Sequence, residues 1–290
     1  MSNTDVRTLR LGLIGDPVDA SFSPRFQQAA LDALHIPARY ELWPTPAPQL
    51  IERVRSLCEH HCLGANVTIP YKEAVLPLLD QLDPLAARIG AVNTIVKHHD
   101  YLHGYNTDAQ GLLRALREHE IGGVQGDGHI SLKGYTVILL GAGGSARAAA
   151  FALVAAEVSR LIIVNRHLER AQRLSADVQP FYDGHIFCLS DPTLLVPPHH
   201  ASIIINTTSV GMNEEVSPLP AEVLARFAPD TFVYDMIYHP MQTHLLCQAN
   251  TIGLRTANGL TMLLHQGALA FHLWTGQEAP LAVMRTALFS

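Results

Sequence analysis

The second half of the chain contains four short, almost uninterrupted apolar runs: 135–140 (YTVILL), 160–164 (RLIIV), 201–205 (ASIII) and 231–236 (TFVYDM). A strand with one face in water alternates apolar and polar residues, whereas a strand buried on both faces is apolar along its length. The four runs therefore predict a parallel sheet that is covered on both faces.

A glycine-rich turn follows the first run directly. Its sequence, GAGGSA at 141–146, fits the GxGxxG/A spacing of dinucleotide-binding turns, and a helical segment begins immediately after it. The first glycine allows the tight turn, the second lets a pyrophosphate approach the backbone, and the small last residue lets the helix pack on the strand. We interpret the turn as a cofactor site at the positive end of a helix, with a purely structural turn as the alternative. The expected contacts are Gly141, Ala142, Gly143, Gly144 and Ser145.

The residues after the second run indicate which dinucleotide binds. An NAD site would have an Asp or Glu there to bind the ribose 2′-hydroxyl. This chain instead has Asn165, Arg166 and His167, with Arg170 one helical turn further on. Guanidinium groups match the oxygens of a 2′-phosphate. The sequence therefore favours NADP, while NAD and ordinary surface arginines stay open as alternatives.

The first half of the chain alternates strand-like and helix-like segments, which is typical of an α/β domain. A hairpin over 91–105 and a helix from Asp108 to about Glu118 complete it. Residues 119–134 carry five glycines and few large apolar side chains, so we expect a loop between two domains. The expected strands lie at 9–15, 38–43 and 64–70, and the expected helices begin at Pro24, span 49–62 and begin near Tyr71.

Several polar residues lie in surroundings that do not explain them. Ser23 before Pro24 is interpreted as a helix cap, but Ser21 has no such role. Lys72 is expected in the first turn of a helix, where the macrodipole disfavours a cation and lowers its pKa; a surface lysine is the alternative.

Two amide side chains lie in apolar segments. Asn93 falls within a hairpin strand, and Gln266 falls within a helix over 258–274 that is apolar on nearly every side and so should pack back on the first domain. Buried amides need hydrogen-bond partners, and a substrate hydroxyl can be one. A dinucleotide beside a hydroxyl-rich substrate indicates hydride transfer.

Composition excludes several classes of function. The chain has 290 residues, enough for two cores, and its net charge of -6 argues against a nucleic-acid partner. No apolar run approaches the ~20 residues that a membrane helix needs. The N-terminus lacks an apolar signal core, so we expect a cytoplasmic location.

The four cysteines are interpreted as reduced thiols, because a chain of this length with so few does not form a disulfide scaffold. The segment CEHHC at 58–62 suggests a metal site, but a second ligand cluster is missing from the sequence. We therefore interpret the segment as the end of an amphipathic helix and expect no metal.

A series of motifs runs along nearly the whole chain: SFSP (21–24), NVTIPYK (66–72), GAVNTI (90–95), GYNTD (104–108), GAGGSARA (141–148), NR (165–166), NTTSVGM (206–212), DMIYHPMQT (235–243) and NGLTMLLHQGA (258–268). In this order they resemble the shikimate dehydrogenase family. The resemblance implies reversible, NADP-dependent oxidation of shikimate to 3-dehydroshikimate in aromatic amino-acid and chorismate biosynthesis, without a metal.

The resemblance also implies roles for individual residues. Lys72 would be catalytic with Asp108 beside it, and Met236 and Gly259 would lie near the nicotinamide. The implied substrate contacts are Ser21, Ser23, Thr68, Asn93, Asp108, Tyr238 and Gln266.

The same resemblance implies an α/β protein of two domains. Residues 1–108, completed by helices within 259–290, would form the substrate-binding and catalytic domain. Residues 109–258 would form a Rossmann-type NADP-binding domain with a doubly wound parallel sheet. The only expected partner is the small-molecule substrate, bound by a monomer or a homodimer.

Two departures from the family pattern leave alternatives open. Ala20 stands where many members have His, which bears on substrate preference, and His167 stands where Thr is commoner, which bears on 2′-phosphate binding. A quinate/shikimate dehydrogenase using NAD or both cofactors is therefore the near alternative. A non-catalytic shikimate sensor is the distant one, and the presence of both Lys72 and Asp108 argues against it.

Overall fold

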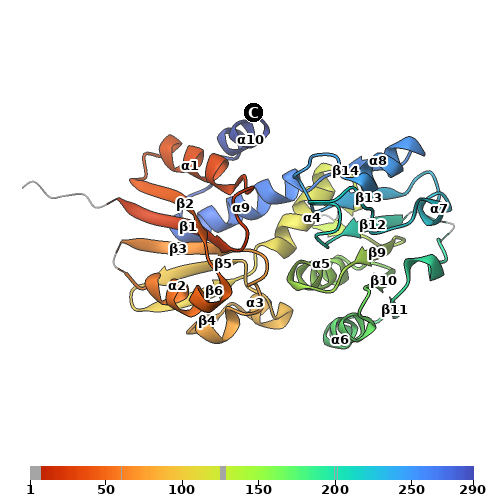
Figure 1. The fold of residues 1–290 in the computed structure, drawn as a ribbon, viewed down its shortest axis with the longest axis horizontal. Coiled ribbons are helices and arrows are strands. Elements are labelled where there is room, and N and C mark those ends of the chain that lie inside the picture. Colours follow the sequence, from red (N-terminus) through yellow and green to blue (C-terminus); the bar gives the residue numbers. More distant parts are fainter. Residues whose placement is uncertain (1–7, 60, 125–128, 199, 201) are drawn as a thin grey trace, which may run out of the picture. The chain divides into compact units, whose positions relative to one another are not determined.

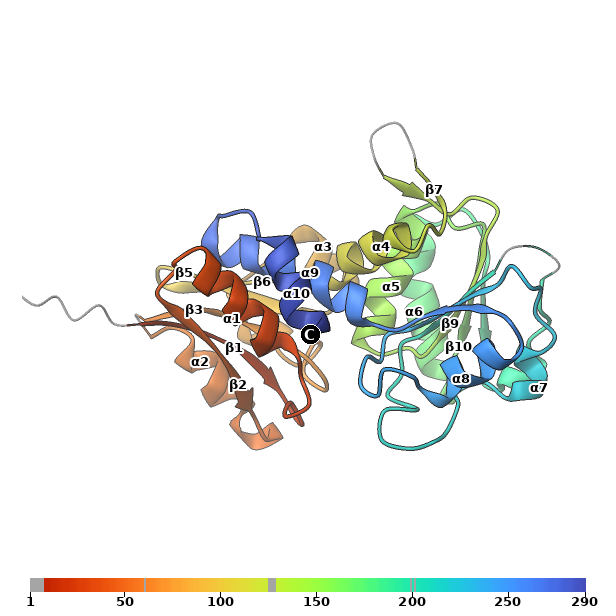
Figure 2. The same ribbon diagram turned by 90° about the horizontal axis from the view of Figure 1, so that it is seen from above.

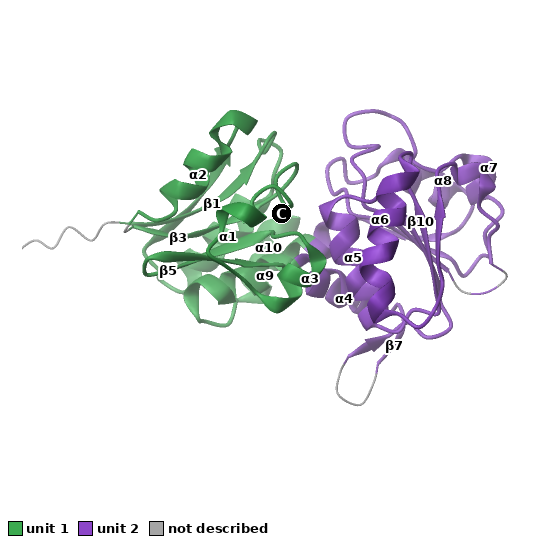
Figure 3. Ribbon diagram, turned by 90° about the horizontal axis from the view of Figure 1, so that it is seen from below, with its two compact units in different colours: residues 1–107, 263–290 green, residues 108–262 purple. Residues whose placement is uncertain are grey.

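The computed structural model describes residues 8–59, 61–124, 129–198, 200 and 202–290. The chain forms two compact units (Figure 3): unit 1 comprises Met1–Thr107 and Leu263–Ser290, and unit 2 comprises Asp108–Met262. We describe each unit by itself.

Unit 1 is built on a mixed six-stranded sheet in the order β2-β1-β3-β5-β6-β4 (Figure 1). Strand β1 is parallel to its neighbours β2 and β3, whereas the hairpin β5–β6 joins β3 in antiparallel fashion. The strands are β1 (Leu9–Gly15), β2 (Ala38–Pro44), β3 (Cys62–Val67), β4 (Gln81–Leu82), β5 (Thr94–His98) and β6 (Tyr101–Tyr105).

Helices from both ends of the chain pack on this sheet. Helix α10 lies against α1 (Figure 2). The side chain of Gln27 on α1 donates to the carbonyl of Gly267 on α9, and Trp274 Nε1 donates to the carbonyl of Ile95 on β5. The C-terminal segment therefore belongs to the core of unit 1. The helices of unit 1 are α1 (Ser23–Ala33), α2 (Leu50–Ser56), α3 (Pro84–Ile89), most of α9 (Leu260–Thr275) and α10 (Leu281–Phe289).

Unit 2 contains a six-stranded, fully parallel sheet in the order β11-β10-β9-β12-β13-β14. From β9, the chain adds β10 and β11 on one side of the sheet and then β12, β13 and β14 on the other side. This strand order is the doubly wound topology. The strands are β9 (Thr136–Leu140), β10 (Arg160–Val164), β11 (Ile186–Leu189), β12 (Ser202–Asn206), β13 (Phe232–Asp235) and β14 (Arg255–Ala257). The predicted parallel sheet and α/β class are confirmed.

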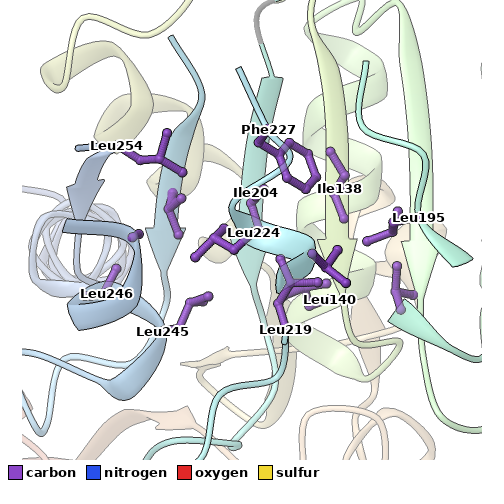
Figure 4. Close-up of a cluster of buried hydrophobic side chains, with 14 of the residues drawn as sticks. Ile138, Leu140, Leu195, Ile204, Leu219, Leu224, Phe227, Leu245, Leu246 and Leu254 are labelled. Carbon is purple, nitrogen blue, oxygen red and sulfur yellow. The ribbon is translucent and has the colours of Figure 1, made fainter. Parts of the chain in front are cut away.

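Both faces of this sheet are buried, as its apolar runs predict. Along β9, Ile138 and Leu140 face a cluster formed with α7 and α8 (Figure 4), and the alternate residues Val137 and Leu139 are fully buried on the other face, where α5 packs. The helices of unit 2 are α4 (Asp108–Glu118), α5 (Gly144–Ala155), α6 (Leu168–Val178), α7 (Ala221–Leu224) and α8 (His244–Thr251).

The helix predicted near Tyr71 is absent from the described structure. Residues 72–75 form turns and are followed by a 3-10 turn at Leu76–Leu78. Pro77 explains the difference, because it has no N–H to donate to the carbonyl of Glu73. Lys72 therefore does not lie in the first turn of a helix, and the predicted helix dipole does not act on it.

The segment 119–134 is also not a loop between the units. It lies within unit 2, where β7 (Gly123–Val124) pairs with β8 (Ile130–Ser131), and residues 125–128 lie outside the described residues. Leu132 is fully buried and its N–H donates to the carbonyl of Ala156 after α5. The few apolar residues of this segment thus anchor it, although its glycine content indicates a linker.

Two smaller boundaries differ from prediction. The helix expected over 49–62 ends at Ser56, because Cys62 already begins β3 and is buried in it. Asn93 precedes β5 by one residue instead of lying within the strand.

Candidate active site

The glycine turn connects β9 to α5 at the carboxyl edge of the unit 2 sheet, beside β12. Gly141 has φ 113°, and a Cβ there would lie 2.5 Å from Thr207 Oγ1, so the turn itself requires glycine. Gly143 differs, because its φ is -95° and a Cβ there would meet no atom within 4 Å. The protein does not require glycine at 143. The open space in front of the α5 N-terminus fits the close approach of a pyrophosphate.

The predicted cofactor residues that follow β10 lie at the same edge of the sheet. Asn165 Nδ2 donates to the carbonyl of His167 at 2.8 Å, which holds the turn into α6. Arg166, His167 and Arg170 are exposed. An exposed pair of arginines at the end of the second strand fits a 2′-phosphate, whereas a ribose 2′-hydroxyl would call for a carboxylate.

The residues expected near the nicotinamide come together within unit 2. Gly259 donates its N–H to the carbonyl of Ile237 at 3.1 Å, and a Cβ on Gly259 would collide with the backbone of Met236. Met236 in turn donates to the carbonyl of Asn206. Tyr238 is half-buried in the same segment as Met236. These residues therefore lie together at the ends of β12 and β13.

Ser21 and Ser23 contact each other at the start of α1. Ser21 Oγ donates to Ser23 Oγ and accepts the N–H of Ser23, both at 3.2 Å. Ser23 is the first helical residue and makes no side-chain cap. The capping interpretation of Ser23 is therefore wrong, and the local backbone role falls to Ser21.

A buried hydrogen-bond network surrounds Asn93. Its Oδ1 accepts the N–H of Thr107 at 2.7 Å, and its Nδ2 donates to Thr107 Oγ1 at 2.9 Å and to Gln266 Oε1 at 3.3 Å. Asn93 is 3% exposed and Gln266 is 8% exposed. The structure thus joins two predicted residues that are 173 positions apart.

Sequence reasoning missed two residues that support Asn93. Asn66 on β3 donates its Nδ2 to the carbonyl of Asn93 and to Thr94 Oγ1, each at 3.1 Å. Tyr40 on β2 donates its hydroxyl to Asn66 Oδ1 at 2.7 Å. An asparagine in the otherwise apolar strand sequence GANV was the available signal for Asn66.

Thr68 and Lys72 lie on the segment that leaves β3. The N–H of Thr68 donates to the carbonyl of Ile14, and the N–H of Val92 donates to the carbonyl of Lys72 at 2.7 Å. The lysine is half-buried. Backbone bonds to two neighbouring segments therefore fix the position from which its side chain extends.

Asp108 is the first residue of α4 and is buried, with 4% exposure. A carboxylate in the first turn interacts favourably with the helix dipole. The preceding residue, Thr107, is bound to Asn93. The chain therefore enters α4 directly from the Asn93 network.

The segment 58–62 does not form the predicted helix end. Cys62 lies in β3, where burial raises the pKa of its thiol, and His61 pairs with Glu59 at 3.3 Å; His60 lies outside the described residues. Within the described part of the chain, no group of three or more His, Cys, Asp or Glu side chains is placed to hold a metal ion. None of the described helices is long and apolar enough to span a membrane.

Three family models match successive parts of the chain. Residues 13–95 match the shikimate dehydrogenase substrate binding domain, residues 125–208 match shikimate / quinate 5-dehydrogenase, and residues 259–289 match the shikimate 5′-dehydrogenase C-terminal domain.

Full-length relatives agree with these models. Shikimate dehydrogenase (NADP(+)) of Moorella thermoacetica is 41% identical over 282 residues, covering 96% of this chain and 92% of its own. Shikimate 5-dehydrogenase of Thermus thermophilus, solved in complex with NADP(H) and shikimate, is 36% identical with a TM-score of 0.81 and covers 97% and 98% of the two chains. Quinate dehydrogenase of Corynebacterium glutamicum in complex with NAD is 28% identical with a TM-score of 0.79, over 97% and 99%.

Identity of this extent over nearly the whole length, with a shared fold and matching family models, confirms the predicted resemblance: the chain belongs to the shikimate dehydrogenase family.

Proposed function

We propose that the protein interconverts shikimate and 3-dehydroshikimate with NADP, by hydride transfer, as a step of aromatic amino-acid biosynthesis. The observation that carries the proposal is the carboxyl edge of the unit 2 sheet. The open space at Gly143 there suits a pyrophosphate, and the exposed Arg166 and Arg170 suit the 2′-phosphate of NADP. The relatives named for shikimate and NADP(+) support the substrate and the cofactor.

Unit 2 is proposed to hold the cofactor. The α5 N-terminus and the turn 141–145 would bind the pyrophosphate, and Asn165, Arg166, His167 and Arg170 would bind the 2′-phosphate side. Met236 and Gly259 would border the nicotinamide. NADP supplies a hydride acceptor when it is bound.

Unit 1 is proposed to hold the substrate. Hydroxyl groups of shikimate need both donors and acceptors, and the unit offers them as serine and threonine hydroxyls and as the amides of the Asn93 network. The proposed contacts are Ser21, Ser23, Thr68, Asn93 and Gln266, together with Asp108 and Tyr238 from unit 2.

Proton transfer is proposed for Lys72 and Asp108. Oxidation of a secondary alcohol removes a hydride from carbon and a proton from oxygen, and the remaining electron pair forms the carbonyl. A base must therefore stand within hydrogen-bond reach of the hydroxyl. We assign this role to the side chain of Lys72, with the buried Asp108 orienting the lysine and the substrate hydroxyl.

Quinate oxidation with NAD is the second candidate, because a quinate dehydrogenase in complex with NAD shares the fold. A steady-state matrix of shikimate and quinate against NADP and NAD separates the candidates. We expect the highest kcat/KM for shikimate with NADP; a higher value for quinate with NAD would replace the proposal. Shikimate binding without turnover in any combination would indicate a sensor.

The protein is also proposed to work in the cytoplasm, as a monomer or a homodimer. All four cysteines are free thiols, which suits a reducing compartment. Sedimentation at several protein concentrations distinguishes the two oligomeric states.

A further inference from the structure

A buried carboxylate lies behind the proposed nicotinamide site. Asp235 is the last residue of β13 and has 0% exposure. Its Oδ1 accepts from Asn206 Nδ2 and from the N–H of Ile237, both at 3.0 Å, and its Oδ2 accepts from Thr243 Oγ1 at 2.6 Å. A charge that is removed from water is costly unless such bonds compensate it, so the residue calls for an explanation.

The bonds of Asp235 close the segment 236–243 at both of its ends. Ile237 lies at the beginning of the segment, and Thr243 lies at its end, where it also caps α8. The same segment carries Met236 and Tyr238. Backbone and side-chain bonds connect it further to Gly259 and Asn258, through the carbonyls of Ile237 and Met241. One carboxylate thus ties down the loop from which two proposed site residues project.

Asn206 extends the arrangement toward the phosphate turn. Its Oδ1 accepts both the N–H and the hydroxyl of Thr208, at 3.0 and 2.7 Å. The adjacent Thr207 donates its hydroxyl to the carbonyl of Leu140, directly before Gly141. The ends of β9, β12 and β13 are therefore connected through a continuous chain of hydrogen bonds and backbone, all of it within unit 2.

We infer that Asp235 is a positioning residue for hydride transfer: it holds the segment 236–243 against the sheet edge so that Met236 keeps its place beside the nicotinamide and Tyr238 keeps its place as a substrate contact. This inference rests on the proposed function. Burial also raises the pKa of Asp235 to about 6, against the lowering effect of its hydrogen bonds. The fold thus keeps a costly carboxyl where a hydrophobic residue would pack without that cost.

Backbone hydrogen exchange tests the inference without relying on activity. In Asp235→Asn, we expect exchange of the amides in 236–243 to accelerate on the order of tenfold or more, because one anchor is lost, while the amides of β10 stay unchanged. Asp191→Asn is the matched control, since Asp191 is an exposed carboxylate of the same unit that accepts from Thr193. Exchange of 236–243 within about twofold of wild type would overturn the inference.

Kinetics add the primary isotope effect, which does not change when part of the protein is unfolded. We expect Asp235→Asn to lower kcat on the order of tenfold or more and to raise the primary isotope effect with 4-deuterated NADPH, because a misplaced nicotinamide slows the hydride step. Binding of adenosine 2′,5′-bisphosphate, which lacks the nicotinamide, should be unchanged. A lower kcat with an unchanged isotope effect would reduce Asp235 to a structural role.

A second pair of variants guards against misfolding of Asp235→Asn. Thr243→Val removes the hydroxyl bound to Oδ2, and Thr243→Ser keeps it. We expect Thr243→Val to show the faster amide exchange and the larger isotope effect expected of Asp235→Asn, and Thr243→Ser to behave nearly as wild type. Equal behaviour of the two would refute the anchor. A wild-type protein that does not turn over shikimate would refute the proposed function, while the exchange comparison would still decide the role of Asp235.

Discussion

The buried carboxyl of Asp235 makes stability depend on pH in an unusual direction. Its pKa is raised from 3.8 to about 6, with desolvation as the largest cause. Between these two values the folded protein binds a proton that the unfolded chain has released. The free energy of unfolding must therefore fall as pH rises through this window, which is opposite to the effect of a salt-bridged carboxylate.

The size of the effect follows from the shift. A difference of roughly two pKa units corresponds to roughly 3 kcal/mol in full, and about 2 kcal/mol of this falls between about pH 4 and about pH 7. Other carboxyl groups titrate in the same range, so the wild-type slope alone does not isolate Asp235. The difference between wild type and Asp235→Asn does, because the variant lacks this one titration and keeps the others.

Urea unfolding at a series of pH values measures this difference. The free energy of unfolding of wild type, minus that of Asp235→Asn, should decrease by about 2 kcal/mol from about pH 4 to about pH 7. Asp191→Asn serves as the control; hydrogen bonds from Thr193 lower the pKa of that exposed carboxyl, so its removal should not produce a decrease in this direction. A flat difference for Asp235→Asn would show that hydrogen bonding from Asn206, Ile237 and Thr243 balances the effect of burial on the pKa, and a difference that rises with pH would show that it outweighs burial.

Three further predictions concern the proposed site. Arg166→Ala should raise KM for NADP at least about tenfold, worth ~1.4 kcal/mol, and barely change KM for NAD. Arg160→Ala, at the opposite end of β10, is the control. An equal rise in KM for both cofactors would exclude a 2′-phosphate contact. Lys72→Ala should lower kcat by about 10²- to 10⁴-fold with little change in shikimate affinity, and adding Asp108→Asn to it should lower kcat by much less than Asp108→Asn does alone. Lys97→Ala is the control. Turnover of Lys72→Ala within about threefold of wild type would transfer the base role to Asp108. Asn66→Ala should cost about 1–3 kcal/mol of stability, because the buried hydroxyl of Tyr40 loses Asn66 Oδ1 as an acceptor. It should also raise KM for shikimate, and an unchanged KM would mean that Asn93 keeps its orientation without Asn66.

Local signals in the sequence were sufficient for the Rossmann-type sheet and for the glycine turn between β9 and α5. Strands buried on both faces must be apolar throughout, and a turn that brings backbone close to phosphate must contain glycine, so each feature is readable from a few consecutive residues. Helix α4 was predicted from Asp108 to about Glu118, and its bounds agree. Pro77 is equally visible in the sequence, and its missing N–H is the local signal against a helix beginning near Tyr71.

Only the tertiary structure decided which polar side chains meet. Gln266 reaches Asn93 because α9 packs on the unit 1 sheet, and Asp235 reaches Thr243 because the chain turns back from β13 into α8. The sequence by itself determined the fold class, the glycine turn and the family, since these depend on periodicity and on short motifs. The supporting partners Tyr40, Asn66 and Asn206 have no such pattern: a hydrogen bond acts over about 3 Å, and only packing brings groups from distant parts of the chain within that range.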